Sequence, residues 1–223
     1  MSVRRSRRAG RCASTSTVAL TLVLTLAPFA AALAADALDR FLADLTSWRA
    51  PFTQEVIDSA GKSVERGSGT LLVGRPGRFR WEYTPQDGGA QLLIADGKNL
   101  WFYDQELQQA TVKPASSALA ATPVVLLSGT DAEMHAAFEI VPQAARAGLA
   151  WVKVTPRSAT ADFASAELGF RDTQLQRLRI HDRLGQTVTL SFTRSVRNSP
   201  LLDSELQFTP PAGVDVIGTA VAP

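Results

Sequence analysis

Cysteine and histidine are nearly absent from this chain. Its 223 residues include one cysteine, Cys12, and two histidines, His135 and His181. Neither histidine has a cysteine or a second histidine at metal-ligand spacing, and we therefore expect no metal site. Cys12 lies before a long apolar run and not at its end, so it is not placed to carry a lipid anchor. A chain that loses Cys12 would contain no disulfide, even in an oxidising compartment.

Acidic residues are absent from the first 35 positions, whereas five arginines lie within the first 11. An apolar stretch rich in alanine and leucine follows. It ends in Ala32-Leu33-Ala34, the small-x-small pattern that signal peptidase recognises. The sequence therefore predicts a Sec signal peptide over residues 1–34. Residues 35–223 are then expected to form a single domain in the periplasm.

The predicted mature chain also lacks an excess of basic residues. Without the five N-terminal arginines, 18 lysines and arginines face 21 aspartates and glutamates, a net charge of about −3. The basic isoelectric point of the full chain therefore comes from the signal peptide. No basic stripe remains of the kind that binds nucleic acid, so we expect no nucleic-acid partner.

Catalytic sequence motifs are missing as well. The chain contains no G-x-S-x-G elbow, P-loop or H-E-x-x-H sequence. His181 and Asp182 are adjacent, but Asp182 and Gly185 have the turn chemistry of a β-hairpin, which explains their presence. Asp131 and Glu133 suit the first turn of a helix, where carboxylates complement the helix dipole. We therefore expect no catalytic residue, no enzymatic activity and no cofactor.

Two segments have a helical pattern. Residues 114–136 contain helix formers, Gly129 as a helix end and Thr130 or Asp131 as a cap, which predicts two or three short helices. Residues 36–48 predict one amphipathic helix, because their apolar residues recur at helical spacing. These apolar residues are Leu38, Phe41, Leu42, Leu45 and Trp48.

Most other segments alternate apolar and polar residues, which is typical of strands with one buried face. Turn signals between them, such as Asp96-Gly97, indicate an antiparallel meander. Before the helical insertion, strands are expected twice within 52–74 and then over 77–84, 90–95, 98–104 and 106–114. After it, they are expected over 138–143, 149–156, 164–172, 174–182, 186–193 and 204–211.

A meander of this length tends to curl on itself. The sequence therefore predicts a mainly β fold, an incomplete (open) antiparallel β-barrel of about 11 strands. Its apolar concave face needs a cover, and the helical segments 36–48 and 114–136, called the lid, would provide one. Phe79, Trp81 and Tyr83 alternate along one strand and share one face. We expect this face to line the space between the barrel and the lid.

Four sequence blocks occur in the order and spacing of a known family. Together with the signal peptide and the mid-chain helices, they resemble the periplasmic outer-membrane lipoprotein carriers, the LolA-type chaperones. The resemblance extends from Asp36 to the region of Ile217. The blocks are FTQ at 52–54, RPGRFRW at 75–81, DGKNLWFYD at 96–104 and FTPPAGVDV at 208–216.

The resemblance implies an open barrel closed by a helical lid, in a monomeric periplasmic chaperone. Such a carrier binds the acyl chains of triacylated outer-membrane lipoproteins in a hydrophobic cavity. It receives them from an ABC-type release complex of the inner membrane and delivers them to a lipoprotein receptor of the outer membrane. The alternative is a lipid- or stress-sensing regulatory module on the same open-barrel scaffold, because one fold hosts many functions.

The resemblance also implies roles for individual residues. Arg75 would be the latch that hydrogen-bonds the lid backbone in the closed state, and Phe79 would act in lid control and cargo transfer. Without the resemblance, Arg75 before a proline at a strand entrance is also compatible with a solvated turn residue. Further candidates for the acyl cavity or the lid are Trp81, Tyr83, Leu93, Leu100, Phe102, Leu119, Val124, Leu126 and Leu127.

Two parts of the chain agree less well with the family pattern. The C-terminal residues 217–223 leave little length for an extra strand. The segment 114–136 matches in character more than in identity. In addition, Trp101 and Tyr103 alternate with Leu100 and Phe102, so one of these pairs is expected to serve barrel packing alone.

Overall fold

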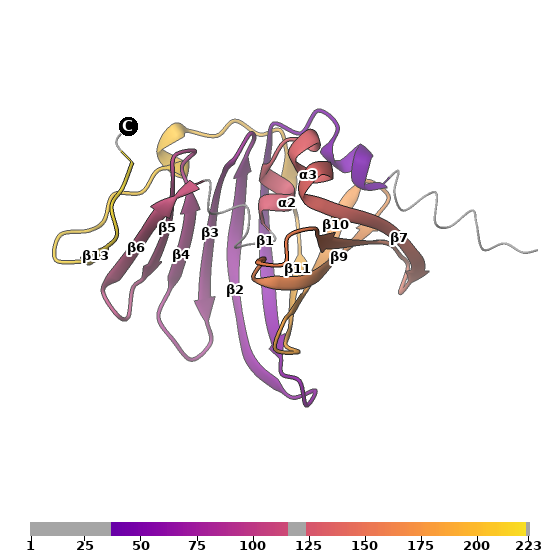
Figure 1. Ribbon diagram of the computed structural model, residues 1–223, viewed down its shortest axis with the longest axis horizontal. Helices are drawn as coiled ribbons and strands as arrows, with labels where there is room; N and C mark the ends of the chain where they lie inside the picture. Colours follow the sequence, from indigo (N-terminus) through magenta and orange to yellow (C-terminus); the bar gives the residue numbers. More distant parts are fainter. Residues whose placement is uncertain (1–36, 116–123, 222–223) are drawn as a thin grey trace, which may run out of the picture.

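The computed structural model describes residues 37–115 and 124–221. Most of these residues form one 13-stranded sheet, and short helices lie against one of its faces (Figure 1). The predicted signal peptide and Leu119 lie outside the described residues. In the part of the chain that the structure describes, no helix is long and apolar enough to cross a membrane.

The strands form two groups separated by the helical insertion. The first group is β1 (Ser47–Ile57), β2 (Ser63–Gly74), β3 (Arg78–Pro85), β4 (Gln91–Ala95), β5 (Asn99–Asp104) and β6 (Gln109–Pro114). The second group is β7 (Phe138–Arg146), β8 (Leu149–Pro156), β9 (Phe163–Arg171), β10 (Gln174–Asp182), β11 (Thr187–Phe192) and β12 (Val196–Arg197). The C-terminal segment contributes a 3₁₀ helix, η2 (Asp203–Leu206), and β13 (Asp215–Ile217).

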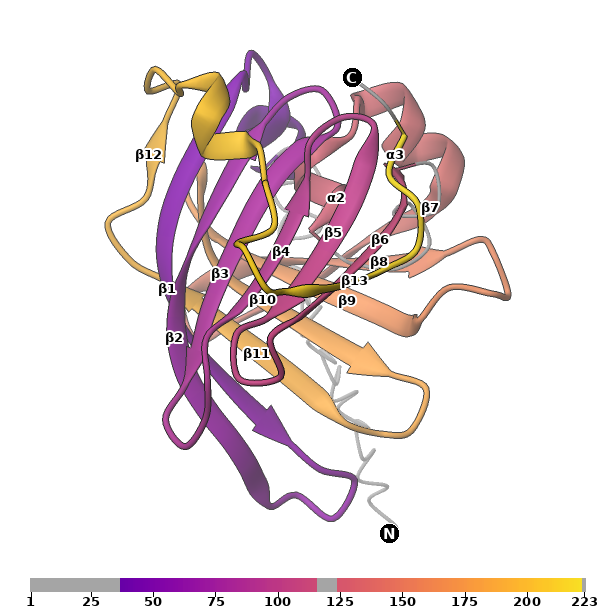
Figure 2. The ribbon, with the colours of Figure 1, turned by 90° about the vertical axis from the view of Figure 1, so that its left-hand side faces the viewer.

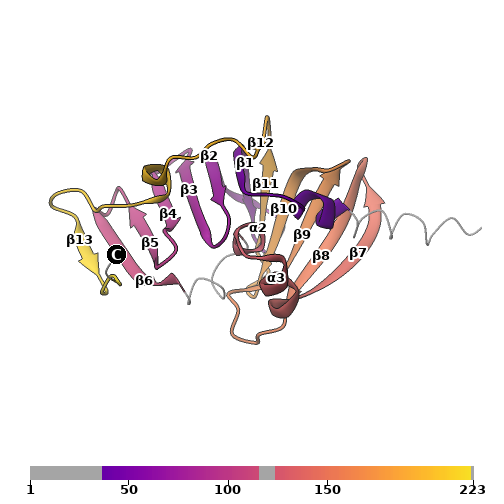
Figure 3. The ribbon, with the colours of Figure 1, turned by 90° about the horizontal axis from the view of Figure 1, so that it is seen from above.

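The sheet is open. Its strand order is β13-β6-β5-β4-β3-β2-β1-β11-β10-β9-β8-β7, with β12 beside β1. The two groups therefore join where β1 pairs with β11, and β7 and β13 form the two outer edges. Seen from above, the sheet curves around the helices (Figure 3). This architecture confirms the predicted open barrel with a helical cover, with slightly more strands than predicted.

The C-terminal segment differs from the prediction. The strand expected over 204–211 is instead the 3₁₀ helix η2 followed by irregular chain. The carboxylate of Glu205 explains this: it accepts a hydrogen bond from the Leu202 backbone N–H and pairs with Arg49, which favours a turn. The added strand β13 was not expected, and it pairs with β6 in parallel, with Val216 opposite Ala110.

The N-terminal helix is also shorter than predicted. Within the described residues it covers 37–42, and Asp44 then adopts a left-handed conformation with a φ of 54°. Trp48 lies in β1 opposite Val73, not in the helix. Its burial fits a strand as well as a helix, because Trp48, Ala50 and Phe52 are all buried with a period of two.

The helical insertion contains α2 (Val125–Ser128) and α3 (Asp131–Ala137). Gly129 separates them, as the sequence indicates. Thr130 caps α3: its hydroxyl accepts a hydrogen bond from the Glu133 N–H, and the Glu133 carboxylate accepts one from the Thr130 N–H. This reciprocal capping box stabilises the start of a helix that is too short to be stable alone.

Each face of the sheet has its own apolar cluster. The face that carries the helices, called the inner face, has the main core, which includes Trp48, Phe79 and Leu127. The opposite, outer face has a small cluster of Ile94, Trp101 and Val112 with Leu92 and Phe208 against it. The C-terminal segment crosses this outer face over β3 to β6 (Figure 2). Of the two alternating pairs in β5, the one with Trp101 therefore serves packing, and the one with Leu100 faces inward.

Candidate functional site

Three stacked aromatic rings form the floor of the inner face. The ring centroids of Trp81 and Tyr83 are 5.1 Å apart, and the Phe52 ring lies 6.0 Å from that of Trp81 and nearly parallel to it. Two glycines of β2 provide the space beneath. A Cβ atom on Gly67 would lie 2.6 Å from the Tyr83 ring, and one on Gly69 would lie 2.7 Å from the Phe52 ring. The glycines thus allow large rings to lie flat, close to the sheet backbone.

An apolar row crosses the inner face from the core toward solvent. In the strand register, Leu71 lies opposite Trp81, Trp81 opposite Leu93, and Leu93 opposite Phe102. Leu71 is fully buried, Trp81 and Leu93 are half-buried, and Phe102 is 39% exposed. The row therefore offers a continuous apolar surface that is accessible at its β5 end.

Side chains of the α2 region pack against another part of the same face, around Phe79. Val124, Leu126 and Leu127 are buried in the main core, together with Phe79, which is 0% exposed. Leu100 belongs to the same cluster. Every candidate cavity residue within the described chain thus lies on the inner face. In this structure Leu126 and Leu127 fill the space between the sheet and the helices.

Two segments cover the inner face: the N-terminal helix with the residues after it (37–46), and the α2–α3 segment (124–137). Arg75 hydrogen-bonds to both of these covers. Its Nη1 donates to the Leu42 carbonyl at 2.9 Å, and its Nε and Nη2 donate to the Gly129 carbonyl at 2.9 and 2.6 Å. Nη2 also pairs with the Asp131 carboxylate at 2.6 Å. The side chain is only 11% exposed, so the solvated-turn alternative is wrong. Arg75 contacts lid backbone, as the resemblance implies.

The local sequence explains how Arg75 reaches the helices. It follows the last residue of β2, and a cis peptide joins it to Pro76. Gly77 has a φ of 70°, which favours glycine, and its N–H donates to the Ser128 carbonyl at 2.7 Å. The turn between β2 and β3 therefore contacts the end of α2 through both its backbone and the arginine.

Two further residues that bind a cover were not predicted. Arg197 Nη2 donates to the carbonyls of Phe41 and Ala43 at 2.9 and 2.8 Å, and Asn198 Nδ2 donates to the Asp44 carbonyl at 2.9 Å. These groups satisfy carbonyls that a helix end leaves without partners. The only local signal was an arginine and an asparagine in a polar segment, because the contacts join residues more than 150 positions apart.

The titratable groups of the site have structural partners. Burial and the hydrogen bond that Tyr83 donates to Glu65, at 2.7 Å, raise the pKa of the tyrosine hydroxyl. Hydrogen bonds from the backbone and side chain of Thr130 lower the pKa of Glu133. Within residues 37–115 and 124–221, no three His, Cys, Asp or Glu side chains are grouped as metal ligands. The described part of the inner face is therefore lined mainly by apolar side chains.

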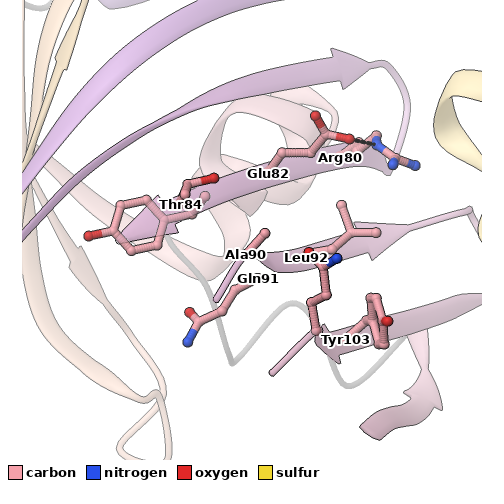
Figure 4. Close-up of a pocket in the computed structure, with 9 residues that line it drawn as sticks. Arg80, Glu82, Thr84, Ala90, Gln91, Leu92 and Tyr103 are labelled. Atoms are coloured by element: carbon pink, nitrogen blue, oxygen red, sulfur yellow. Dashed lines mark hydrogen bonds and ion pairs between the residues drawn. The ribbon is translucent and has the colours of Figure 1, made fainter. Parts of the chain in front are cut away.

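A separate pocket lies on the outer face. It has a volume of about 230 Å³ and lies over β3 to β5, with Arg80, Glu82, Leu92 and Tyr103 among its lining residues (Figure 4). Arg80 and Glu82, neighbours on one face of β3, form an ion pair at 2.6 Å along one wall of this pocket. Most of its walls come from outward-facing side chains, but Tyr83 of the aromatic floor also lines it, at the end of β3.

Comparison with known proteins identifies the family. The family model described as outer membrane lipoprotein carrier protein LolA matches residues 43–209. The outer-membrane lipoprotein carrier protein of Dechloromonas aromatica is 37% identical over 185 residues, which cover 83% of this chain and 88% of that protein. The carrier of Bordetella pertussis is 34% identical, with 93% and 97% covered.

A solved structure also has a similar fold. It is an uncharacterized conserved protein from Thermus thermophilus, with a TM-score of 0.50, 19% identity, and coverage of 82% of this chain and 98% of that one. The family match and the identity to curated carriers extend over most of the described residues. On this evidence, the chain belongs to the LolA family of outer-membrane lipoprotein carrier proteins.

Proposed function

We propose that this protein is a periplasmic chaperone that binds lipoprotein acyl chains between the inner face of the sheet and the helices. It takes triacylated outer-membrane lipoproteins from an inner-membrane ABC-type release complex and delivers them to an outer-membrane receptor. The observation that carries the proposal is an apolar inner face covered by helices, with one largely covered arginine, Arg75, hydrogen-bonded to both helical segments. Membership in a carrier family supports the cargo class and agrees with the expectation that the chain is not an enzyme.

The energetics of acyl transfer make such a cover useful. Each buried methylene is worth about 0.8 kcal/mol, so extraction of several acyl chains from a bilayer costs tens of kcal/mol. Loading therefore needs the external energy of the release complex. Delivery has to be spontaneous, and the carrier consequently has to hold acyl chains less tightly than the next acceptor does. Leu126 and Leu127 provide this property, because they fill the site when cargo leaves.

Arg75 is the proposed latch of the closed, empty form. Hydrogen bonds to charged groups contribute about 1.5–3 kcal/mol each, and Arg75 donates to carbonyls of both covers. Cargo that opens the lid breaks some of these bonds, and their recovery favours release. Phe79, fully buried beneath the same lid, is the proposed residue through which the lid and the acyl chains compete for the inner face.

A release assay tests the proposal. Purified mature protein is incubated with spheroplasts that export a triacylated lipoprotein, and the soluble fraction is analysed for a one-to-one complex. We expect release that depends on this protein and fails with an unacylated variant of the cargo. If lipoprotein stays in the membrane while the protein still binds free lipid, the sensing module becomes the better function.

Residues 1–34 are proposed to direct the chain to the periplasm and to be removed there. N-terminal sequencing of the protein from a periplasmic extract should then begin near residue 35. A mature form that retains the basic N-terminus, or that fractionates with the membrane, would contradict both the signal peptide and the soluble carrier.

A further inference from the structure

Charge is unevenly distributed between the two halves of the sheet. Residues 138–197, which form β7 to β12, contain nine lysines and arginines and five acidic residues. The other described residues contain nine basic and fifteen acidic side chains. The described chain as a whole is slightly acidic, so the basic half stands out against its own protein.

Four basic side chains of this half share the outer face, and this set is called the basic face: Arg146 of β7, Lys153 of β8, and Arg177 and Arg179 of β10. The strand register places them together, because Lys153 and Arg179 both lie opposite Glu167 of β9. Glu167 pairs with Arg146 at 2.6 Å and is largely covered, with 16% of its side chain exposed. Lys153 is exposed, and the basic face keeps a net positive charge.

A buried tryptophan holds two of these arginines in place. The Trp151 ring is 1% exposed, and the guanidinium carbons of Arg146 and Arg179 lie 4.2 and 5.2 Å from its centroid. The ring can lie flat against the sheet because Gly169 is opposite Trp151, and a Cβ there would be 3.0 Å from it. Cation–π contacts of this kind order the guanidinium groups before any partner binds.

Neither the helices nor the C-terminal segment lies over the basic face. The helices lie on the inner face, and the C-terminal segment crosses the outer face of β3 to β6, where Phe208 packs 5.5 Å from Trp101 (Figures 2 and 3). A protein bound to the basic face would therefore leave the lid and the apolar row free to exchange cargo.

We propose that the basic face docks an acidic protein surface on one of the two membrane partners that the proposed function requires. The inference rests on that function for the identity of the partner. Ordered guanidinium groups suit carboxylates, which they bind with two parallel hydrogen bonds. An anionic membrane is the less favoured partner, because a membrane-binding face usually carries exposed hydrophobic side chains. Among the described residues of β7 to β10, Val141 is the only large hydrophobic residue that is exposed. The acidic remainder of the chain would also be repelled by such a membrane.

The test compares two double charge reversals. Arg177→Glu/Arg179→Glu changes the basic face, and Lys62→Glu/Arg66→Glu makes the same charge change on the β1–β2 hairpin. Association with the purified periplasmic parts of the release complex and of the receptor is measured by stopped flow at low and high salt. We expect the basic-face variant to associate about tenfold more slowly with one partner at low salt, and the wild-type rate to fall with salt. The hairpin variant should match the wild type.

Two controls keep the outcomes distinct. Lys153→Glu provides a milder reversal at an exposed position if the double variant does not fold. Acyl binding is measured in the same preparations with a fluorescent lipopeptide, so failure of the wild type there would count against the proposed function and not against the docking face. Wild-type association rates in folded basic-face variants would overturn the inference. So would salt-dependent binding to phosphatidylglycerol vesicles without binding to either protein partner.

Discussion

The two covers of the inner face are held in different ways. At the end of the N-terminal helix (residues 37–42), side chains from two distant segments bind four successive carbonyls. Arg197 binds those of Phe41 and Ala43, Arg75 binds that of Leu42, and Asn198 binds that of Asp44. By contrast, the described hydrogen bonds from the sheet to the α2–α3 segment come from the β2–β3 turn, with one exception. The exception is a backbone bond from the Arg157 N–H, just after β8, to the Ala137 carbonyl at the end of α3.

Apolar packing strengthens the contrast. The N-terminal helix buries Phe41, whose ring packs edge-on against Trp48 at 5.5 Å and against Phe170 at 5.8 Å. In α2–α3, the buried side chains are aliphatic, as in Leu127 and Met134. From this comparison we expect α2–α3 to be the part of the lid that moves and the N-terminal helix to stay with the sheet. Proteins draw such moving elements from their less strongly held segments.

Arg75→Leu should have the largest effect. It removes the bonds to Gly129 and Leu42, so α2–α3 loses its main tie while Arg197 still holds the N-terminal helix. Each lost hydrogen bond is worth about 1.5–3 kcal/mol, and about 1.4 kcal/mol corresponds to a factor of ten in an equilibrium constant. We therefore expect the rate of hydrogen exchange in residues 124–137 to rise by at least tenfold. Lipoprotein should load, but transfer to the receptor should slow.

The control for this variant is Arg78→Leu, because Arg78 pairs with the exposed Asp203 and does not contact the lid. Its exchange and transfer should match the wild type. If Arg75→Leu transfers lipoprotein at the wild-type rate, Arg75 does not act as a latch.

Arg197→Leu should loosen the N-terminal helix and leave α2–α3 unchanged. Loss of its bonds to Phe41 and Ala43 should increase hydrogen exchange in residues 37–46 severalfold, because a helix end loses partners for two carbonyls. Residues 124–137 should exchange as in the wild type. Arg194→Leu, at an exposed nearby position, is the matched control. Equal loosening of both covers would show that they open as one unit.

Leu127→Ala separates a lid from an ordinary core. A truncated core leucine costs about 2–5 kcal/mol, and Leu168→Ala in β9 should show this as a lower thermal midpoint alone. In Leu127→Ala, the weakened cover should also raise binding of a hydrophobic dye. If both variants lose stability without any gain in dye binding, Leu127 is a core residue and not a competitor of cargo.

Acid should loosen α3 slightly. Its capping box lowers the pKa of Glu133, so this carboxylate stabilises the folded helix above the pKa of the unfolded chain, and the effect is lost as pH falls through the lower, folded value. We expect exchange in α3 to increase modestly below about pH 4.5. Glu133→Gln should reduce this pH dependence, and an unchanged profile would assign it to another group.

Much of the sheet could be predicted from local patterns. The bounds of β8 and β10 agree with the expected 149–156 and 174–182, because alternating residues are flanked by turn residues. The helix over 36–48 was overestimated, since Trp48 satisfies both a helical and a strand period. The tie from Arg197 could not be foreseen, because it exists only once β12 pairs with β1. Arg75 was found through the family resemblance and not through its local sequence.

Distance measurements between spin labels test the central comparison most directly. The predicted mature chain has no cysteine, so paired labels can be placed at exposed positions without interference: His135 in α3 with Leu184 in the β10–β11 turn, and Asp39 with Leu184. On addition of a triacylated lipopeptide, the His135–Leu184 distance should change and the Asp39–Leu184 distance should stay constant. A bound lipopeptide that shifts the Asp39–Leu184 distance, or that leaves both distances unchanged, would contradict a moving α2–α3 lid on a fixed N-terminal helix.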